Sequence, residues 1–301
     1  MNSNFKSGFV SFIGRTNVGK STLLNCLMNE KVAITANKPQ TTRTAIKAIL
    51  NSNDYQIIIT DTPGIHKPKT KLSETMINTT YSTLQDVDII VFLIEATSNE
   101  IGPGDKKIIE KLKSLNKNCI LVINKIDLIE KEKLLKLIKI YSEEYDFKAI
   151  IPISATNHKG IEELISEIVN LLPNGPMYYD KEEYTDQTTR QIIEETIREK
   201  SLIYLKDEVP HGIYVEVEKF KTGKTMKNEK IFNIDATIYT IKESHKGIII
   251  GKNGSMLKKI STSARYDIEK MLNEKVNLKI WVKVKEDWQE KESIIQKFKL
   301  Q

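Results

Sequence analysis

Cysteine is scarce in this sequence, and long apolar runs are missing. The 301 residues include two cysteines, Cys26 and Cys119, which lie far apart among apolar neighbours. Two such thiols argue against a disulfide framework or a metal site, and we expect both to be buried. No apolar run approaches the roughly 20 residues that a membrane helix needs. The first residues, MNSNFKSGFVSFIG, lack the pattern of an export signal, so we expect a cytoplasmic protein.

An excess of acidic charge is also absent, because the formal net charge is +6. The positive excess lies in residues 242–301, where 14 Lys and Arg stand against 8 Asp and Glu, and the rest of the chain is balanced. A cationic C-terminal part favours a polyanionic partner. A Lys-rich surface that only keeps the protein in solution is the alternative.

Two patterns of apolar residues divide the chain. Up to residue 172, short apolar runs such as GFVSFIG, YQIIIT and NCILVIN alternate with amphipathic segments. This pattern predicts an α/β domain over residues 1–172, with a mostly parallel sheet flanked by helices. LPNGP then marks a linker, taken as residues 173–190. Residues 191–301 follow the order helix, strand, strand, short helix, helix, strand and final helix, which predicts a smaller α+β domain.

The segment GRTNVGKS (residues 14–21) fits the phosphate-loop pattern G-x-x-x-x-G-K-[ST], between a predicted strand and a predicted helix. In such a loop, backbone N–H groups at a helix N-terminus bind phosphate oxygens. We expect Lys20 to bridge the β- and γ-phosphates and Ser21 to bind Mg²⁺. The expected nucleotide contacts in this region are Gly14, Asn17, Val18, Gly19, Lys20, Ser21 and Thr22.

The segment DTPG (residues 61–64) directly follows the apolar run YQIIIT, which is predicted to be a strand. Asp61 stands at a strand end, where its carboxylate can reach Mg²⁺, and the N–H of Gly64 can contact the γ-phosphate. In the intervening KPQTTRTAI (residues 38–46), one threonine should close over the γ-phosphate and complete the Mg²⁺ shell. We favour Thr42 over Thr41; otherwise both hydroxyls cap a turn. The candidate catalytic residues are Lys20, Thr42 and Gly64, and the candidate metal ligands are Ser21, Thr42 and Asp61.

Two further strand ends carry NKID (residues 124–127) and SAT (residues 154–156). The carboxylate of Asp127 can accept hydrogen bonds from N1–H and N2–H₂ of guanine. Adenine would leave it unpaired, at a cost of roughly 1 to 3 kcal/mol. The N–H of Ala155 can meet the guanine O6. We therefore predict GTP and GDP as ligands, held by Asn124, Lys125, Asp127, Ser154 and Ala155, with ATP as a weaker alternative.

GIIIGKNG (residues 247–254) contains a Gly-x-x-Gly with a cationic residue, between two predicted helices. This is how a KH module clamps about four nucleotides of single-stranded RNA. The glycines let the phosphate backbone come close, the lysine supplies charge, and the isoleucines form the floor of the groove. A plain turn in a basic domain is the alternative. The expected RNA contacts are Ile248, Ile249, Ile250, Gly251, Lys252, Asn253 and Gly254.

These motifs resemble the Era family of bacterial ribosome-assembly GTPases over nearly the whole chain. Further matches are QTTR (residues 40–43), TD (185–186), IREK (197–200) and DEVPH (207–211). The resemblance implies a Ras-like P-loop G domain followed by a type II KH domain. It also implies binding to the 3′ end of 16S rRNA and a role in maturation of the 30S subunit. Some members associate peripherally with the inner membrane; we expect a monomer that does not bind DNA.

Two residues bear on how this family would hydrolyse GTP, and a third departs from it. Ile65 matches the apolar residue that replaces a catalytic Gln, so the resemblance implies that switch backbone groups or a partner orient the water and that turnover is slow. Asn17 matches an Asn that helps hold K⁺ in several relatives. Thr16 stands where relatives commonly have Pro.

The predicted function is a GTP-hydrolysing switch whose nucleotide state controls RNA binding through the linker near Pro173. An RNA-binding chaperone whose G domain hardly turns over GTP is the alternative.

Overall fold

The computed structural model describes residues 4–36, 38, 41–65 and 67–299. Pro39, Gln40 and His66 of the predicted motifs lie outside these residues. The chain forms two compact units. The first comprises residues 1–35, 42–186 and 298–301, and the second comprises Ala36–Thr41 and Gln187–Lys297. Among the described residues, none of the helices combines the length and apolarity needed to span a bilayer.

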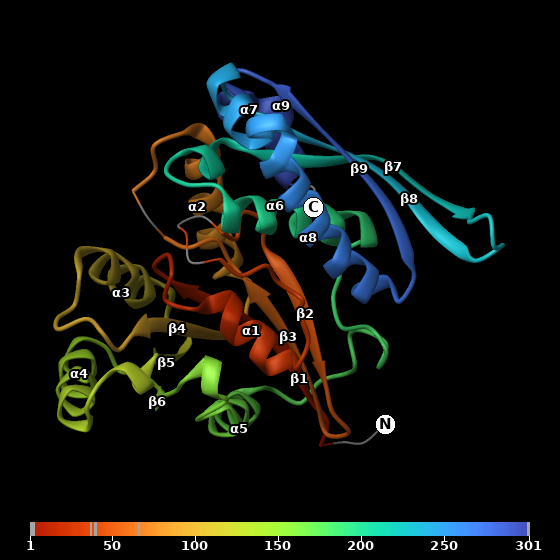
Figure 1. Ribbon diagram of the computed structural model, residues 1–301. Coiled ribbons are helices and arrows are strands. Elements are labelled where there is room, and N and C mark those ends of the chain that lie inside the picture. The colour runs from red at the N-terminus through yellow and green to blue at the C-terminus, as the bar shows by residue number, and fades with distance from the viewer. Residues whose placement is uncertain (1–3, 37, 39–40, 66, 300–301) are drawn as a thin grey trace. The chain divides into compact units, whose positions relative to one another are not determined.

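The first unit is a six-stranded sheet with helices on both faces, which can be followed in Figure 1. The strand order is β2-β3-β1-β4-β5-β6, with β2 antiparallel to β3 and the other neighbours parallel. This confirms the predicted α/β class. The strands are β1 Lys6–Gly14, β2 Ile46–Asn51, β3 Tyr55–Asp61, β4 Ile89–Glu95, β5 Asn118–Asn124 and β6 Ala149–Pro152. The helices are α1 Lys20–Met28, α2 Lys71–Thr83, α3 Pro103–Leu115, α4 Lys131–Glu144 and α5 Ile161–Leu171, with 3₁₀ turns η1 Ile126–Leu128 and η2 Ala155–Asn157.

In β4 and β5 every residue from Ile89 to Ile94 and from Cys119 to Ile123 is apolar, because both faces of the sheet are covered. On β4, Val91 and Leu93 belong to the core formed with α1 and α5, whereas Phe92 and Ile94 belong to the core formed with α3 and α4. All four side chains are fully buried. In this arrangement the carboxyl ends of the parallel strands meet at one edge of the sheet, where ligands bind in open α/β folds.

The segment after α5 stays attached to the first unit as far as Asp186. Its backbone is hydrogen-bonded to three strands of the sheet. The Ser7 N–H donates to the Pro173 carbonyl (3.2 Å), Tyr178 N–H to Gln56 Oε1 (2.7 Å) and Ile49 N–H to the Tyr184 carbonyl (2.9 Å). The chain therefore passes into the second unit at Gln187, beyond the prolines that mark the predicted linker.

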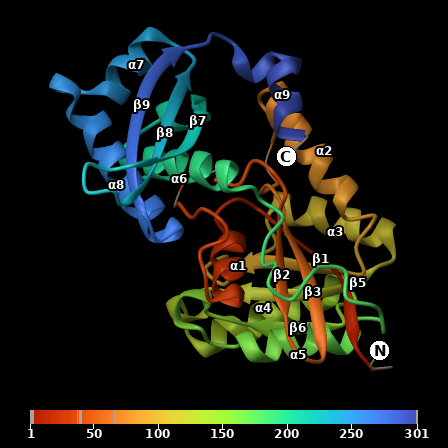
Figure 2. The same ribbon diagram turned by 90° about the vertical axis from the view of Figure 1, so that its right-hand side faces the viewer.

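The second unit packs helices against a three-stranded sheet of order β7-β8-β9, seen in Figure 2. The predicted hairpin is present as antiparallel β7 and β8, and β9 lies parallel to β8. The apolar faces of α6 and α8 form one core with the sheet. The elements are α6 Thr189–Tyr204, η3 Val209–Gly212, β7 Tyr214–Lys224, β8 Lys230–Thr240, α7 Glu243–Ile250, η4 Lys252–Gly254, α8 Ser255–Leu272, β9 Lys275–Val284, η5 Trp288–Glu290 and α9 Glu292–Lys299.

Candidate active site

The predicted phosphate loop connects β1 to α1 and is braced by Asn124 of β5. Gly19 has a φ of 100°, and a Cβ there would lie 2.3 Å from Nδ2 of Asn124, so only glycine fits. The same Nδ2 donates to the carbonyl of the buried Val18 at 2.9 Å. Asn17 is exposed with a φ of 66°, and Thr22 is half-buried in α1.

Lys20 points back into the loop. Its Nζ donates to the carbonyl oxygens of Arg15 at 3.0 Å and Gly14 at 3.3 Å. Burial lowers the pKa of Lys20 to about 8, and the nearby carboxylate of Asp61 opposes this shift. The positive charge of the ammonium group is therefore not fully balanced within the protein, and a phosphate anion would supply the missing negative charge.

Ser21, Thr42 and Asp61 converge although they come from three separate segments. Ser21 Oγ donates to Asp61 Oδ2 at 2.7 Å, and Thr42 Oγ1 donates to the same oxygen at 3.2 Å. The two hydroxyl oxygens are 2.8 Å apart. Asp61 is fully buried, and this desolvation raises its pKa, opposed by the charge of Lys20. The other oxygen, Oδ1, is buried and finds no hydrogen-bond partner in the described part of the chain.

The two candidate threonines differ in their surroundings. Thr42 is 6% exposed and meets Ser21 and Asp61, as described. Thr41 belongs to the second unit, where its Oγ1 donates to the carbonyl oxygens of Lys38 at 2.7 Å and Ala36 at 3.1 Å. The geometry therefore favours Thr42 at the oxygen cluster.

Gly64 and Ile65 lie against the phosphate loop. The N–H of Ile65 donates to the Gly14 carbonyl at 3.0 Å, and Ile65 forms a parallel bridge with Arg15. A Cβ on Gly64 would lie 2.8 Å from Cα of Thr16, so the two backbones touch. The Ile65 side chain is 7% exposed and packs into the core beside α3. Backbone, and not the Ile65 side chain, thus faces the loop.

Two loops form the predicted base pocket. Lys125 Nζ donates to the Asn17 carbonyl and to Glu95 Oε2, both at 2.8 Å, which bridges the base loop to the phosphate loop. Asp127 is exposed in η1 and Ser154 is buried after β6. The N–H of Ala155 donates to Asn124 Oδ1 at 3.1 Å, so this donor is already engaged within the protein.

Both predicted domains match known families. The model of 50S ribosome-binding GTPases matches residues 9–125, and the KH domain model matches residues 208–289. The GTPase Era of Caldanaerobacter subterraneus subsp. tengcongensis is 52% identical over 293 residues, which cover 97% of each chain. The chain belongs to the Era family of GTPases. Its substrate is therefore GTP, which it hydrolyses to GDP and phosphate.

Solved structures of the family extend this match. Era in complex with MgGDPNP and nucleotides 1506–1542 of 16S ribosomal RNA has a TM-score of 0.93 at 37% identity, covering 98% of each chain. A Tyr-to-Ala variant of Aquifex aeolicus Era bound to GDP.AlF4⁻ has the same TM-score and identity, covering 98% of this chain and 99% of that one. The predicted Ras-like G domain and KH domain are thus confirmed.

In the KH domain, the Gly-x-x-Gly turn joins α7 to α8. Gly251 and Gly254 have φ angles of 72° and 76°, the left-handed region that favours glycine. Lys252 and Asn253 between them are exposed. Among the isoleucines, Ile248 is 50% exposed, but Ile249 is fully buried in the domain core. The structure therefore does not place Ile249 on the surface with Ile248, because the helical period of 3.6 residues turns its side chain inward.

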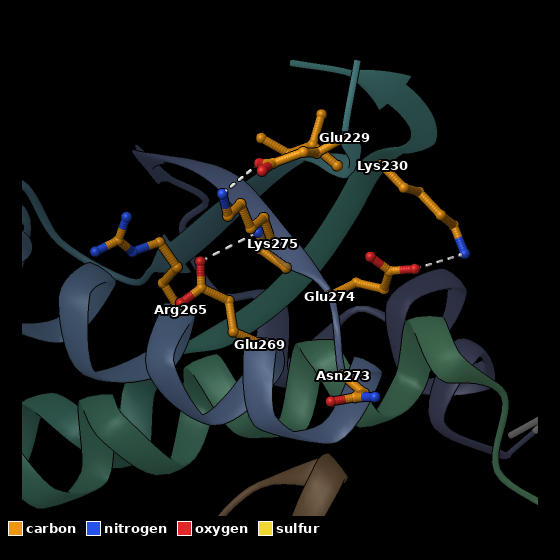
Figure 3. Close-up of a pocket in the computed structure, with 9 residues that line it drawn as sticks. Glu229, Lys230, Arg265, Glu269, Asn273, Glu274 and Lys275 are labelled. Carbon is orange, nitrogen blue, oxygen red and sulfur yellow. Dashed lines mark hydrogen bonds and ion pairs between the residues drawn. The ribbon is translucent and has the colours of Figure 1, made fainter. Parts of the chain in front are cut away.

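A cavity of about 730 Å³ lies elsewhere in the KH domain, between the last turns of α8 and the start of β9. Figure 3 shows that its charged groups are mostly paired: Lys275 with Glu229, and Lys230 with Glu274. Arg265 points away from these pairs. The 18 residues of α8 make a helix about 27 Å long, so this balanced cavity is distant from the Gly-x-x-Gly turn and unsuited to a polyanion.

Sequence reasoning missed several residues that brace the site. Glu95 ends β4 and pairs with Lys125. Arg15 pairs with Asp105 in the first turn of α3. Neither acid belongs to a sequence motif. The available signal was position: Glu95 is the last residue of β4, and Asp105 lies in the first turn of α3, the next helix along the chain.

Proposed function

We propose that this GTPase binds the 3′ end of 16S rRNA through its KH domain and assists maturation of the 30S subunit. The observation that carries the proposal is the occurrence, in one chain, of the assembled nucleotide site and an exposed Gly-x-x-Gly turn with Lys252. The 16S rRNA segment bound by the related Era supports it. The positive excess of the C-terminal part also suits an RNA partner.

Mg²⁺ is the metal implied by the family, and the residues present fit it. Ser21, Thr42 and Asp61 supply only oxygen atoms, the donors that this ion prefers. The buried Oδ1 of Asp61, which has no hydrogen-bond partner among the described residues, could accept a hydrogen bond from a water on such a cation. When bound, Mg²⁺ neutralises charge on the β- and γ-phosphates. Ser21 and Thr42 would hold it directly, and Asp61 directly or through water.

The catalytic roles follow from where the chain places its donors. Lys20 would exchange its two carbonyl partners for phosphate oxygens, and loop N–H groups would bind the remaining ones. Because the Ile65 side chain is buried, water must be oriented by backbone groups near Thr42 and Gly64, or by a partner. We infer slow intrinsic turnover. The exposed Asn17 is the proposed ligand of a K⁺ ion near the phosphates, where the ion would act as an arginine finger does.

Guanine would be read by Asp127 and held by Asn124 and Lys125. Asn124 occupies the Ala155 N–H, so contact of that donor with O6 requires the hydrogen bond to be shared or exchanged. Single-turnover hydrolysis in K⁺ against Na⁺ buffer, with and without the rRNA segment, tests the reaction. Hydrolysis stimulated by K⁺ is expected; none in any condition would favour the chaperone alternative.

RNA binding by the turn can be tested against a matched control. Lys252→Asp with Asn253→Asp should abolish binding of the 16S rRNA segment but leave basal hydrolysis unchanged. Lys227 and Asn228, at the tip of the β7–β8 hairpin, are the same dipeptide, are also exposed and also have a left-handed Asn. The same two changes there add equal negative charge and should leave binding within about threefold. Equal loss in both variants would refute a specific clamp in favour of general charge attraction.

Nucleotide state could reach the KH domain at the bond between residues 41 and 42. In the second unit, Arg198 is 2% exposed and its Nη2 donates to the Thr41 carbonyl. In the first unit, the next residue, Thr42, belongs to the oxygen cluster. A ligand that fixes Thr42 therefore acts on the residue next to the Arg198 contact.

The coupling is measured as the ratio of RNA affinities in GDPNP and in GDP. Arg198→Lys, which loses the planar fork, should bring this ratio close to one. Arg190→Lys is the control, since Arg190 lies on the same helix and donates to the Val217 carbonyl at 2.7 Å. An unchanged ratio for Arg198→Lys would exclude this route and leave the one near Pro173. Cytoplasmic location, peripheral attachment to the inner membrane and a monomeric state stay predictions, tested by cell fractionation and sedimentation.

A further inference from the structure

A buried carboxylate lies next to the phosphate loop without belonging to any nucleotide motif. Asp105 is fully buried in the first turn of α3. Its Oδ1 accepts a hydrogen bond from Arg15 Nε at 3.0 Å, and its Oδ2 accepts one from Tyr141 Oη at 3.1 Å. Arg15 Nη2 also donates to Ser98 Oγ at 3.0 Å. Burial raises the pKa of Asp105, and the Arg15 charge is the main opposing influence.

Arg15 connects this network to the reacting end of the site. It is the second residue of the phosphate loop, and its carbonyl accepts the hydrogen bond from Lys20. Its backbone pairs with Ile65, whose N–H is bound to the adjacent Gly14. A shift of the Arg15 backbone would therefore move both the Lys20 ammonium and the segment after Gly64.

We propose that Asp105, with Ser98 and Tyr141, is a positioning residue for GTP hydrolysis, which acts by fixing Arg15 and thereby the backbone of residues 14 and 15 against Ile65. An ion pair with one buried partner is weak evidence for stability, and we infer that this pair instead fixes the position of the Arg15 side chain. The position of this backbone matters because the Ile65 side chain cannot orient the attacking water, so that backbone groups must do so. The inference rests on the proposed nucleotide site.

Gly102, the N-cap residue of α3, and Gly104, in its first turn, allow the position of the Arg15 side chain to be changed without changing its charge. A Cβ on Gly104 would lie 3.0 Å from Cδ and 3.2 Å from Cγ of Arg15. These atoms cannot easily yield because the guanidinium is held by Asp105 and Ser98. A Cβ on Gly102 would lie 3.8 Å from Nη1 of Arg15, an ordinary contact. Gly104→Ala therefore displaces Arg15, and Gly102→Ala is its matched control.

The test compares Asp105→Asn, Gly104→Ala, Gly102→Ala and the parent protein in Mg²⁺ and K⁺ buffer. Single-turnover GTP hydrolysis, the Kd for GDP and the Tm are measured for each full-length chain. We expect hydrolysis to fall at least about tenfold in Asp105→Asn and Gly104→Ala, with the Kd for GDP changed less than about threefold. Gly102→Ala should match the parent in all three measurements.

Either of two other outcomes would overturn the inference. Unchanged hydrolysis in both Asp105→Asn and Gly104→Ala would mean that Arg15 needs no fixing. A parallel loss of hydrolysis, GDP affinity and Tm in both would mean that the network only holds α3 to the loop. Failure of the proposed nucleotide site is distinguishable, because the parent protein itself would then bind neither GTP nor GDP.

Discussion

Replacing Gly64 with Ala tests whether backbone position controls hydrolysis. Gly64 does not have a left-handed φ, so alanine meets no intrinsic strain there, and the effect is steric. The added Cβ would lie 2.8 Å from both Cα and Cγ2 of Thr16 and 2.9 Å from its N. Carbon atoms prefer about 3.5 to 4.0 Å, so the two segments must separate by about 0.7 to 1.2 Å. Two of these three atoms are backbone, so a rotamer change of Thr16 cannot relieve the clash.

A displacement of that size at reacting groups lowers the rate about 100-fold, equivalent to about 2.7 kcal/mol in the barrier. The assay is single-turnover hydrolysis of GTP with enzyme in excess, alongside a titration with fluorescent GDP. GDP affinity should stay close to the parent value, because Gly64 is expected to contact only the γ-phosphate. Gly102→Ala controls for the gain of a methyl group near the site. A Gly64→Ala rate within about threefold of the parent would refute the reasoning.

Four further outcomes are expected from the same geometry. Asp61→Asn should weaken the Mg²⁺-dependent part of GTP binding and spare GDP binding measured in EDTA; equal losses in both would contradict its place in the metal shell. Asp127→Asn should shift preference from GTP to xanthosine triphosphate, measured by competition, and undiminished GTP binding would count against the base assignment. In the nucleotide-free protein the pKa of Lys20 is about 8, and the triphosphate should raise it. GTP binding above about pH 8 should therefore take up protons, which calorimetry in buffers of different ionisation enthalpy would measure. Ile65→Val keeps the core packing and should hydrolyse GTP near the parent rate; a drop of more than about tenfold would show that the side chain acts after all.

The sheet and the order of its elements could be predicted because burial on both faces leaves a plain mark on the sequence. The runs GFVSFIG, YQIIIT and NCILVIN (residues 8–14, 55–60 and 118–124) overlap β1, β3 and β5 to within two residues at each end. The Gly-x-x-Gly turn was equally readable, since left-handed residues between helices favour glycine. The burial of Ile249 could not be predicted, because three consecutive isoleucines do not show which of them faces the core, and only the helical geometry of α7 decides it.

The ion pairs that support the nucleotide site were harder to predict from the sequence. Asp105 follows Gly-Pro-Gly, so from sequence it is most simply a residue of a helix start, favoured there by the helix dipole. Its partner Arg15 is 90 residues away in the chain. Pairings of that kind depend on how β1, α3 and α4 pack, which local pattern does not encode. Glu95 was hidden for the same reason, because its role depends on Lys125 from the neighbouring strand.

The boundary between the two units raises a sharper point about the switch segment. Thr41 and Thr42 are consecutive and cannot be told apart by a sequence pattern, but they belong to different units. The Thr41 carbonyl accepts a hydrogen bond from Arg198, whereas the Thr42 hydroxyl contacts Ser21 and Asp61. Adjacent residues joined by a planar peptide bond cannot move independently over more than a few ångströms. Ordering of Thr42 by a metal-bound triphosphate therefore restricts the carbonyl that Arg198 holds. The comparison of Arg198→Lys with Arg190→Lys tests whether this restriction reaches the KH domain.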